Sequence, residues 1–219
     1  MKDIRKTFSL NWLYLSGVGL LLLSGLIFLL VTSKGQGFLY INSFHTKPLD
    51  SFFIAYTNLG DGIFTILIVL FLLATRRFDY AWQILAAFLI SGLIVQILKN
   101  TVYSPRPREF FANQHIYLLD GITLSGTSSF PSGHTATIFA LATLLSFFTR
   151  NKWISLLYLL LAISVGYSRI YLSQHFPLDV WTGACIGVFT ALAVYFIYYN
   201  RIKHRLSKKI TDTKTATIQ

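Results

Sequence analysis

Residues 13–32, LYLSGVGLLLLSGLIFLLVT, form an uncharged apolar run that decides the fold class. An α-helix needs about 20 apolar residues to cross the hydrocarbon core of a bilayer. The run follows a basic start, MKDIRK, but it is longer than the apolar region of a usual signal peptide, and no small-residue cleavage site follows it. We therefore expect an uncleaved first membrane span.

The composition of the whole chain agrees with a membrane protein. The 219 residues are 54% hydrophobic and 12% charged, whereas soluble domains carry about 25% charged residues. This composition excludes a disordered chain, which needs low hydrophobicity and high charge. The net charge of +11 would suggest nucleic acid in a soluble protein. In an apolar chain it indicates basic loops beside anionic lipid headgroups, so the expected partner is the lipid bilayer and not nucleic acid.

Five further apolar runs predict an all-α protein that crosses the membrane six times. The runs cover residues 63–74, 80–98, 135–148, 153–166 and 180–199. The first of these is short for a span unless its helix begins near Asn58 and carries Asp61 at its mouth. We expect one six-span domain over residues 1–200 and a basic cytoplasmic tail over residues 201–219, frayed after Arg205.

The basic residues predict how the spans are oriented. Six spans place both termini on one side, and that side holds 13 of the 19 Lys and Arg residues. By the positive-inside rule both termini are cytoplasmic, in the plasma membrane or the inner membrane of a bacterium. The six basic residues on the outer side are Lys34, Lys47, Lys99, Arg106, Arg108 and Arg169.

Two long segments lie on the outer side. Within residues 34–60, apolar residues recur at Leu49, Phe52, Phe53 and Tyr56, which predicts an amphipathic helix. This helix either lies on the membrane surface or caps the helix bundle, and it is a candidate gate for substrate access. Residues 100–130 are rich in Pro, Gly and Ser, which indicates a loop.

Polar residues suited to phosphate gather where the predicted spans end on the outer side. Consecutive spans alternate in direction, so the connection between the third and fourth spans lies on the same side as that between the fifth and sixth. Arg presents a planar fork that matches phosphate oxygens, and a Ser-Gly start offers backbone N–H groups at a helix N-terminus. The gathered residues are Lys99, Arg106, Ser132, Gly133, His134, Arg169, His175 and Asp179.

Two histidines add chemistry to this binding site. His175 and Asp179 are four residues apart, so a carboxylate can fix the tautomer of the imidazole and leave its other nitrogen free to attack phosphorus. Pro177 suits the first position of a helix, which places His175 just outside that helix. His134 is a candidate general acid for the departing oxygen. The other histidines, His45, His115 and His204, are expected to make structural hydrogen bonds.

Three motifs give the chain a family resemblance. They are Lys, six residues and Arg-Pro at 99–107, Pro-Ser-Gly-His at 131–134, and Ser-Arg, five residues, His, three residues and Asp at 168–179. Together they resemble the type 2 phosphatidic acid phosphatase family, the lipid phosphate phosphatases, which share their site with vanadium haloperoxidases. The resemblance implies that His175 is the nucleophile, oriented by Asp179, and that His134 protonates the leaving group. It implies phosphate binding by Lys99, Arg106, Ser132, Gly133 and Arg169.

The resemblance also implies an activity. We expect a membrane phosphatase that hydrolyses a terminal phosphate from an envelope lipid through a phosphohistidine. Undecaprenyl diphosphate and lipid A phosphate are ranked ahead of phosphatidylglycerophosphate and phosphatidic acid. No cofactor and no metal are expected, because the site offers one carboxylate, too few for a typical Mg²⁺ centre. The alternatives are a lipid-linked phosphotransferase, a haloperoxidase, and a transporter or scaffold with a fossil site. The oligomeric state is not readable from the sequence.

Overall fold

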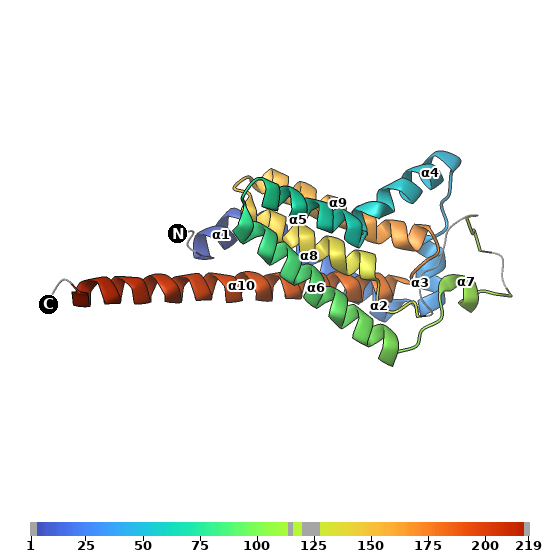
Figure 1. The fold of residues 1–219 in the computed structure, drawn as a ribbon. Coiled ribbons are helices and arrows are strands. Elements are labelled where there is room, and N and C mark those ends of the chain that lie inside the picture. Colours follow the sequence, from blue (N-terminus) through green and yellow to red (C-terminus); the bar gives the residue numbers. More distant parts are fainter. Residues whose placement is uncertain (1–3, 114–115, 120–127, 217–219) are drawn as a thin grey trace.

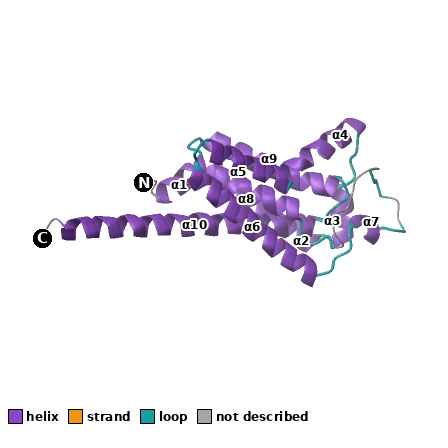
Figure 2. Ribbon diagram, viewed as in Figure 1, coloured by secondary structure: helices purple, strands orange, loops and turns teal. Residues whose placement is uncertain are grey.

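The computed structural model of the chain describes residues 4–113, 116–119 and 128–216. These residues form helices and connecting loops, and no strand occurs among them, as Figure 2 shows. The all-α class expected from the apolar runs is confirmed. The elements are α1 (Ile4–Leu10), α2 (Trp12–Val31), α3 (Lys34–Ile41), α4 (Lys47–Tyr56), the 3₁₀ helix η1 (Thr57–Gly60), α5 (Gly62–Ala74), α6 (Phe78–Thr101), α7 (Pro107–Phe110), α8 (Gly133–Phe148), α9 (Lys152–Tyr171) and α10 (Pro177–Ala216).

Four of the described helices are long and apolar enough to cross a membrane: α2, α6, α9 and the part of α10 from Pro177 to Arg201. A fifth crossing is possible if α4, η1 and α5 count together, because this segment is apolar but bends by 53° at its break. The apolar helix α8 has only 16 residues. Between them these elements include every run in which we expected a span.

Helix α8 forms the centre of the bundle (Figure 1). It packs against α10, α9, α6 and α5, and most of its side chains are buried. A helix enclosed by protein does not need the full hydrophobic length of one that faces lipid on its own, which explains why α8 is short. The hydroxyl of Tyr14 on α2 lies 2.8 Å from that of Thr143, so a buried polar contact also links α2 to the central helix.

The contact between α8 and α10 depends on two glycines one helical turn apart. A methyl group on Gly183 would lie 2.5 Å from the carbonyl oxygen of Ser132, and one on Gly187 would lie 2.3 Å from that of Ala136. Small residues at this spacing let the backbones of membrane helices approach closely. This close approach brings the start of α8 beside the start of α10.

The structure differs from the sequence expectations at two places. Helix α10 continues to Ala216, whereas we expected a tail that frays after Arg205. Polarity alone does not end a helix, and residues 200–219 contain no proline or glycine that would stop it. The segment expected to be a loop contains the short helix α7, which begins at Pro107 because a proline suits the first turn.

The α4 helix forms, with Phe53 packed against the end of α9. Residues 114–115 and 120–127 of the expected loop, His115 among them, lie outside the described residues, as does the side chain of His204.

The close packing of α10 on α8 predicts that adding a methyl group at Gly187 lowers the stability of the protein, whereas adding one at an open glycine does not. Gly187→Ala forces a Cβ into the backbone of α8 and should lower the free energy of unfolding by about 1–3 kcal/mol, the range for overpacking. Gly19→Ala on α2 is the matched control, because nothing lies within 4 Å of a Cβ built there. Thermal unfolding in detergent measures both. Equal melting temperatures for the two variants would contradict the close-packing interpretation.

Candidate active site

The predicted site residues meet at the end of the bundle that lies away from both termini (Figure 1). We call this end the distal end. Helix α6 finishes there, α8 starts there, and the turn between α9 and α10 closes it. The alternation of helix directions therefore brings together motifs that are about 30 to 80 residues apart in the sequence.

The start of α8 has the features of an anion site. Ser132 is the N-cap: its side chain accepts the N–H of Thr135 at 3.4 Å and the hydroxyl of the same residue at 2.8 Å. The backbone N–H of Ser132 donates to the carbonyl of Asp179 at 3.0 Å, which ties the motif to α10. The first N–H groups of a helix have no partner within the helix, so Gly133 and His134 offer donors at this end.

Two buried arginines converge on the residue before His175. Arg106 donates to the backbone carbonyl of Gln174 at 3.1 Å, and Arg169 donates to the side-chain oxygen of the same glutamine. Arg169 also donates to Thr57 at 2.7 Å, and each arginine is only 5% exposed. The Nε atom of Arg169 is buried without a hydrogen-bond partner among the described residues. Burial lowers the pKa of Arg106, and the nearby carboxylate of Asp179 opposes that shift.

Lys99 supplies the third cation. It ends α6, and its ammonium donates to the carbonyl of Ser128 at 3.0 Å. The three cations could be identified from the motifs, but Gln174 could not, because it lies in the variable part of the third motif. A glutamine between Ser173 and His175 gave no signal of its own, because amides are common in turns.

His175 and Asp179 form a buried pair. His175 lies in the turn before α10, which begins at Pro177 as expected. Its Nδ1 atom is 3.5 Å from the Oδ2 atom of Asp179, and the backbone N–H of Phe176 donates to the same oxygen at 2.9 Å. Ser129 donates a hydrogen bond to this carboxylate and lies 3.4 Å from the imidazole. Ser129 is a second residue that the sequence analysis missed, since it falls in the Ser-rich loop.

His134 occupies a different environment. It lies in the first turn of α8 with its side chain 27% exposed, and its Nε2 atom is 4.0 Å from Asp61. Asp61 caps α5 by accepting the N–H of Ile63 at 2.9 Å. Gly60 makes this approach possible, because a Cβ there would lie 3.0 Å from the Cβ of His134.

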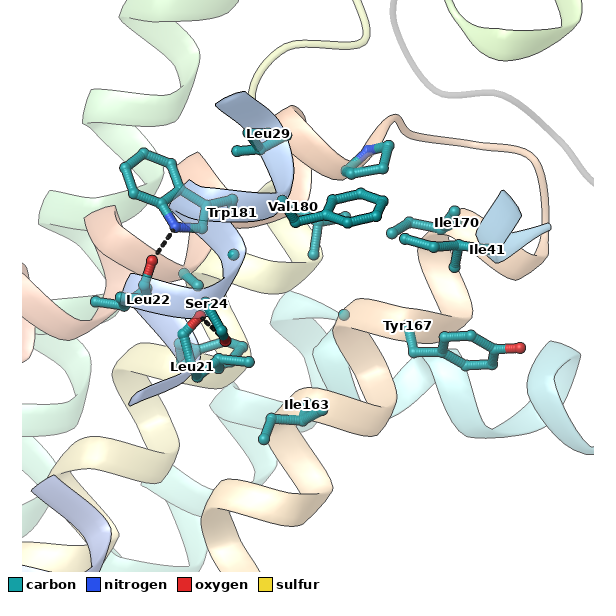
Figure 3. Close-up of a pocket in the computed structure, with 16 residues that line it drawn as sticks. Leu21, Leu22, Ser24, Leu29, Ile41, Ile163, Tyr167, Ile170, Val180 and Trp181 are labelled. Carbon is teal, nitrogen blue, oxygen red and sulfur yellow. Dashed lines mark hydrogen bonds between the residues drawn. The ribbon is translucent and has the colours of Figure 1, made fainter. Parts of the chain in front are cut away.

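A separate apolar pocket lies between α2, α9 and α10 (Figure 3). It has a volume of about 320 Å³, and the indole of Trp181 closes one side by donating to the carbonyl of Leu22 at 2.9 Å. None of the described residues that line it is charged, so it suits hydrocarbon and not phosphate. Among the described residues, no group of three His, Cys, Asp or Glu side chains is placed to hold a metal ion.

Comparison with known proteins identifies the class to which this arrangement belongs. Residues 80–203, more than half of the chain, match the PAP2 superfamily, and the chain belongs to that superfamily. The chain is 27% identical to a lipid A 4'-phosphatase of Bacteroides thetaiotaomicron over 190 residues, which are 81% of this chain and 80% of that protein. It is 26% identical to the undecaprenyl-diphosphatase BcrC of Bacillus subtilis, over 78% of this chain and 92% of that protein.

A solved structure is also similar. The crystal structure of Aquifex aeolicus LpxE superposes with a TM-score of 0.61 at 33% identity, and the match covers 72% of this chain and 92% of that one. The family expected from the three motifs is therefore confirmed, and the likeness agrees with an all-α membrane fold.

The burial of His175 predicts that its ring stays neutral at physiological pH. Burial lowers its pKa to about 4, although the hydrogen bond to Asp179 opposes this shift, whereas an unperturbed histidine titrates near 6.5. Between these two pH values the His175 imidazole binds a proton in the unfolded chain but not in the folded one. The free energy of unfolding therefore decreases progressively as the pH falls from 6.5 towards 4.

NMR of histidine labelled with ¹³C, in detergent, measures the protonation directly, and the spectrum of His175→Asn assigns the resonance. We expect the His175 signal to keep its neutral position from pH 8 to pH 5. A midpoint near 6.5 would contradict the assigned environment.

Proposed function

We propose that this protein removes a terminal phosphate from an envelope lipid through a phosphohistidine on His175. The observation that carries the proposal is the pair of buried arginines that meet at Gln174, directly beside the His175–Asp179 pair. Buried cations need a compensating anion, and the phosphate of a lipid supplies one to two negative charges. Membership of the PAP2 superfamily and the similarity to lipid phosphatases support the same reaction.

In the first step the Nε2 lone pair of His175 attacks phosphorus and the bond from phosphorus to the lipid oxygen breaks. The Nδ1 proton faces Asp179, which keeps the attacking nitrogen deprotonated and stabilises the positive charge that develops on the ring. His134 gives its proton to the departing lipid oxygen. The products of this step are the lipid alcohol, or the lipid monophosphate if the substrate is a diphosphate, and the phosphohistidine.

In the second step water attacks the phosphohistidine. His134, now neutral, takes a proton from the water, the bond from phosphorus to nitrogen breaks, and the electron pair returns to His175. Lys99, Arg106 and Arg169 balance the charge on the phosphoryl oxygens, and the N–H groups of the first turn of α8, with Ser132 and Gly133, hold them in place. Inorganic phosphate then leaves. No cofactor takes part in either step.

The membrane arrangement belongs to the proposal as well. We assign six spans: α2, the bent segment from α4 to α5, α6, α8, α9 and α10 up to about residue 200. Residues 201–219 form the basic cytoplasmic tail. Basic residues are concentrated at the end that carries both termini, so this end lies in the cytoplasm and the distal end faces the periplasm or the outside. The substrate then reaches the site with its chains in the outer leaflet.

Lipid A phosphate is the substrate that we place first. The similarity to the lipid A 4'-phosphatase spans four fifths of both chains, although identity is low. Undecaprenyl diphosphate is the second candidate, favoured by the similarity to the BcrC diphosphatase, which covers nearly all of that protein. Both are anionic lipids whose phosphate lies at the membrane surface.

A substrate panel tests the activity. Purified protein in detergent with excess EDTA should release inorganic phosphate from lipid A, undecaprenyl diphosphate, phosphatidylglycerophosphate and phosphatidic acid at different rates, with lipid A first. All four are compared at the same surface concentration. Phosphate that appears on a second lipid or sugar instead of in solution would indicate a phosphotransferase. Activity that disappears with EDTA and returns with Mg²⁺ would contradict the mechanism, and no turnover of any lipid would favour a transporter or scaffold.

Replacing the nucleophile tests the intermediate. His175→Asn should lower kcat by at least about 10³-fold, because loss of the attacking nitrogen removes the covalent route. A phosphate bound to histidine nitrogen is lost in acid, so the reaction with ³²P-labelled lipid is quenched rapidly at alkaline pH. The label should then be trapped on the wild type and not on the variant. His115→Asn is the matched control and should retain activity. Label on the His175→Asn protein would place the intermediate elsewhere.

A further inference from the structure

A buried carboxylate outside the active site holds a cluster of aromatic side chains. Asp50, in the first turn of α4, is 6% exposed, and it accepts the hydroxyls of Tyr171 at 2.5 Å and Tyr117 at 2.8 Å. The Nδ1 atom of His45 lies 3.4 Å from the same carboxylate. No lysine or arginine among the described residues pairs with it. We call Asp50, His45, Tyr117 and Tyr171 the tyrosine brace.

The rings of the brace are stacked as well as hydrogen-bonded. His45 lies between the two tyrosines, with its ring centroid 4.0 Å from that of Tyr117 and 4.2 Å from that of Tyr171. Its side chain is 7% exposed, and its Nε2 atom has no hydrogen-bond partner among the described residues. Burying a carboxylate costs free energy unless its lone pairs are satisfied, so each of these donors stabilises the cluster. The expectation of a structural role for His45 fits this placement.

The brace is connected to the turn that carries His175. Tyr171 is the last residue of α9, four residues before the nucleophile. The hydroxyl of Ser173 donates to the backbone carbonyl of Tyr117 at 2.9 Å. Asn42, just after α3, donates to the carbonyls of Ile170 and Tyr171, both at 2.9 Å. These bonds satisfy carbonyl groups that the end of a helix leaves without partners.

The turn itself needs such support. Ser173 has a φ of 54°, in the left-handed region that a residue with a side chain adopts at a cost of about 1–3 kcal/mol. The N–H groups of Gln174 and His175 both donate to the carbonyl of Arg169, at 3.0 and 3.1 Å, so one strained residue sets the direction of the nucleophile. A strained backbone conformation persists only where several surrounding contacts hold it in place.

We infer that Asp50 is a positioning residue for His175, and that the segment from α3 to α4 supports the catalytic turn from outside and does not act as a gate. The segment acts through Tyr171, Tyr117 and Asn42, which hold the backbone of residues 170–173. None of these side chains is among the residues proposed to bind the phosphate. The inference rests on the nucleophilic role proposed for His175.

Two graded variants test the inference, each with a matched control. Tyr117→Phe removes one hydroxyl from a half-exposed side chain and should lower kcat about 3- to 10-fold, and Asp50→Asn should lower it about 10- to 100-fold, because small misplacements of a reacting group are costly. KM should stay within about threefold, since the phosphate contacts are intact. Tyr103→Phe and Glu109→Gln are the controls: this tyrosine also donates to a carboxylate, at 2.7 Å, but both residues are exposed and neither bonds to the brace. They should keep kcat within twofold.

The readout is the rate of phosphohistidine formation, by rapid quench with the fastest lipid of the panel, per mole of protein that elutes as a single species. A slower rate in the two brace variants, with KM unchanged and the controls intact, supports positioning. Wild-type rates in both brace variants, equal losses in the controls, or a rise in KM without a change in kcat would overturn it. If Asp50→Asn fails to fold, Tyr117→Phe decides the question. Failure of the proposed function is distinct, because the wild type itself would then form no phosphohistidine.

Discussion

The constraint on which the rest of the site depends is the burial of two guanidinium groups around one glutamine. Arg106 and Arg169 cannot lose their protons in a protein, and removing them from water costs several kcal/mol each unless an anion compensates. Gln174 satisfies one donor of each arginine but carries no charge. In the proposed reaction the phosphate brings the negative charge that these two buried guanidinium groups attract. A water-filled surface would screen the same cations and weaken this preference.

Close helix packing makes this arrangement possible. Gly183 and Gly187 allow α10 to approach the backbone of α8, and the N–H of Ser132 then bonds to the carbonyl of Asp179. The start of α8, which is the proposed anion site, and the carboxylate beside His175 are consequently positioned by one close contact between two helices. Sites held by regular elements keep their geometry better than sites held by loops. The glycine spacing was visible in the sequence, but it has meaning only once α8 is known to be the partner.

The sequence was sufficient for the fold class and for the eight residues that the structure brings to the distal end. Apolar length predicts spans because the bilayer sets a fixed thickness, and alternation of direction places motifs on a common side without any knowledge of packing. It was insufficient where the outcome depends on contacts between distant segments. Gln174, Ser129 and Asp50 acquire their partners only through the fold, and no local pattern marks them. The length of α10 was misjudged because a change from apolar to polar composition signals the end of the membrane and not the end of a helix.

The two histidines differ in their access to the surroundings, since the side chain of His175 is 4% exposed and that of His134 is 27% exposed. In the proposed reaction the nucleophile is therefore the more buried histidine, and the general acid is the more exposed one, near Asp61. The lipid oxygen then departs towards the more accessible side of the site, while the phosphoryl group stays on the buried imidazole. Departure of the two products consequently follows a fixed order, with the lipid first and inorganic phosphate last.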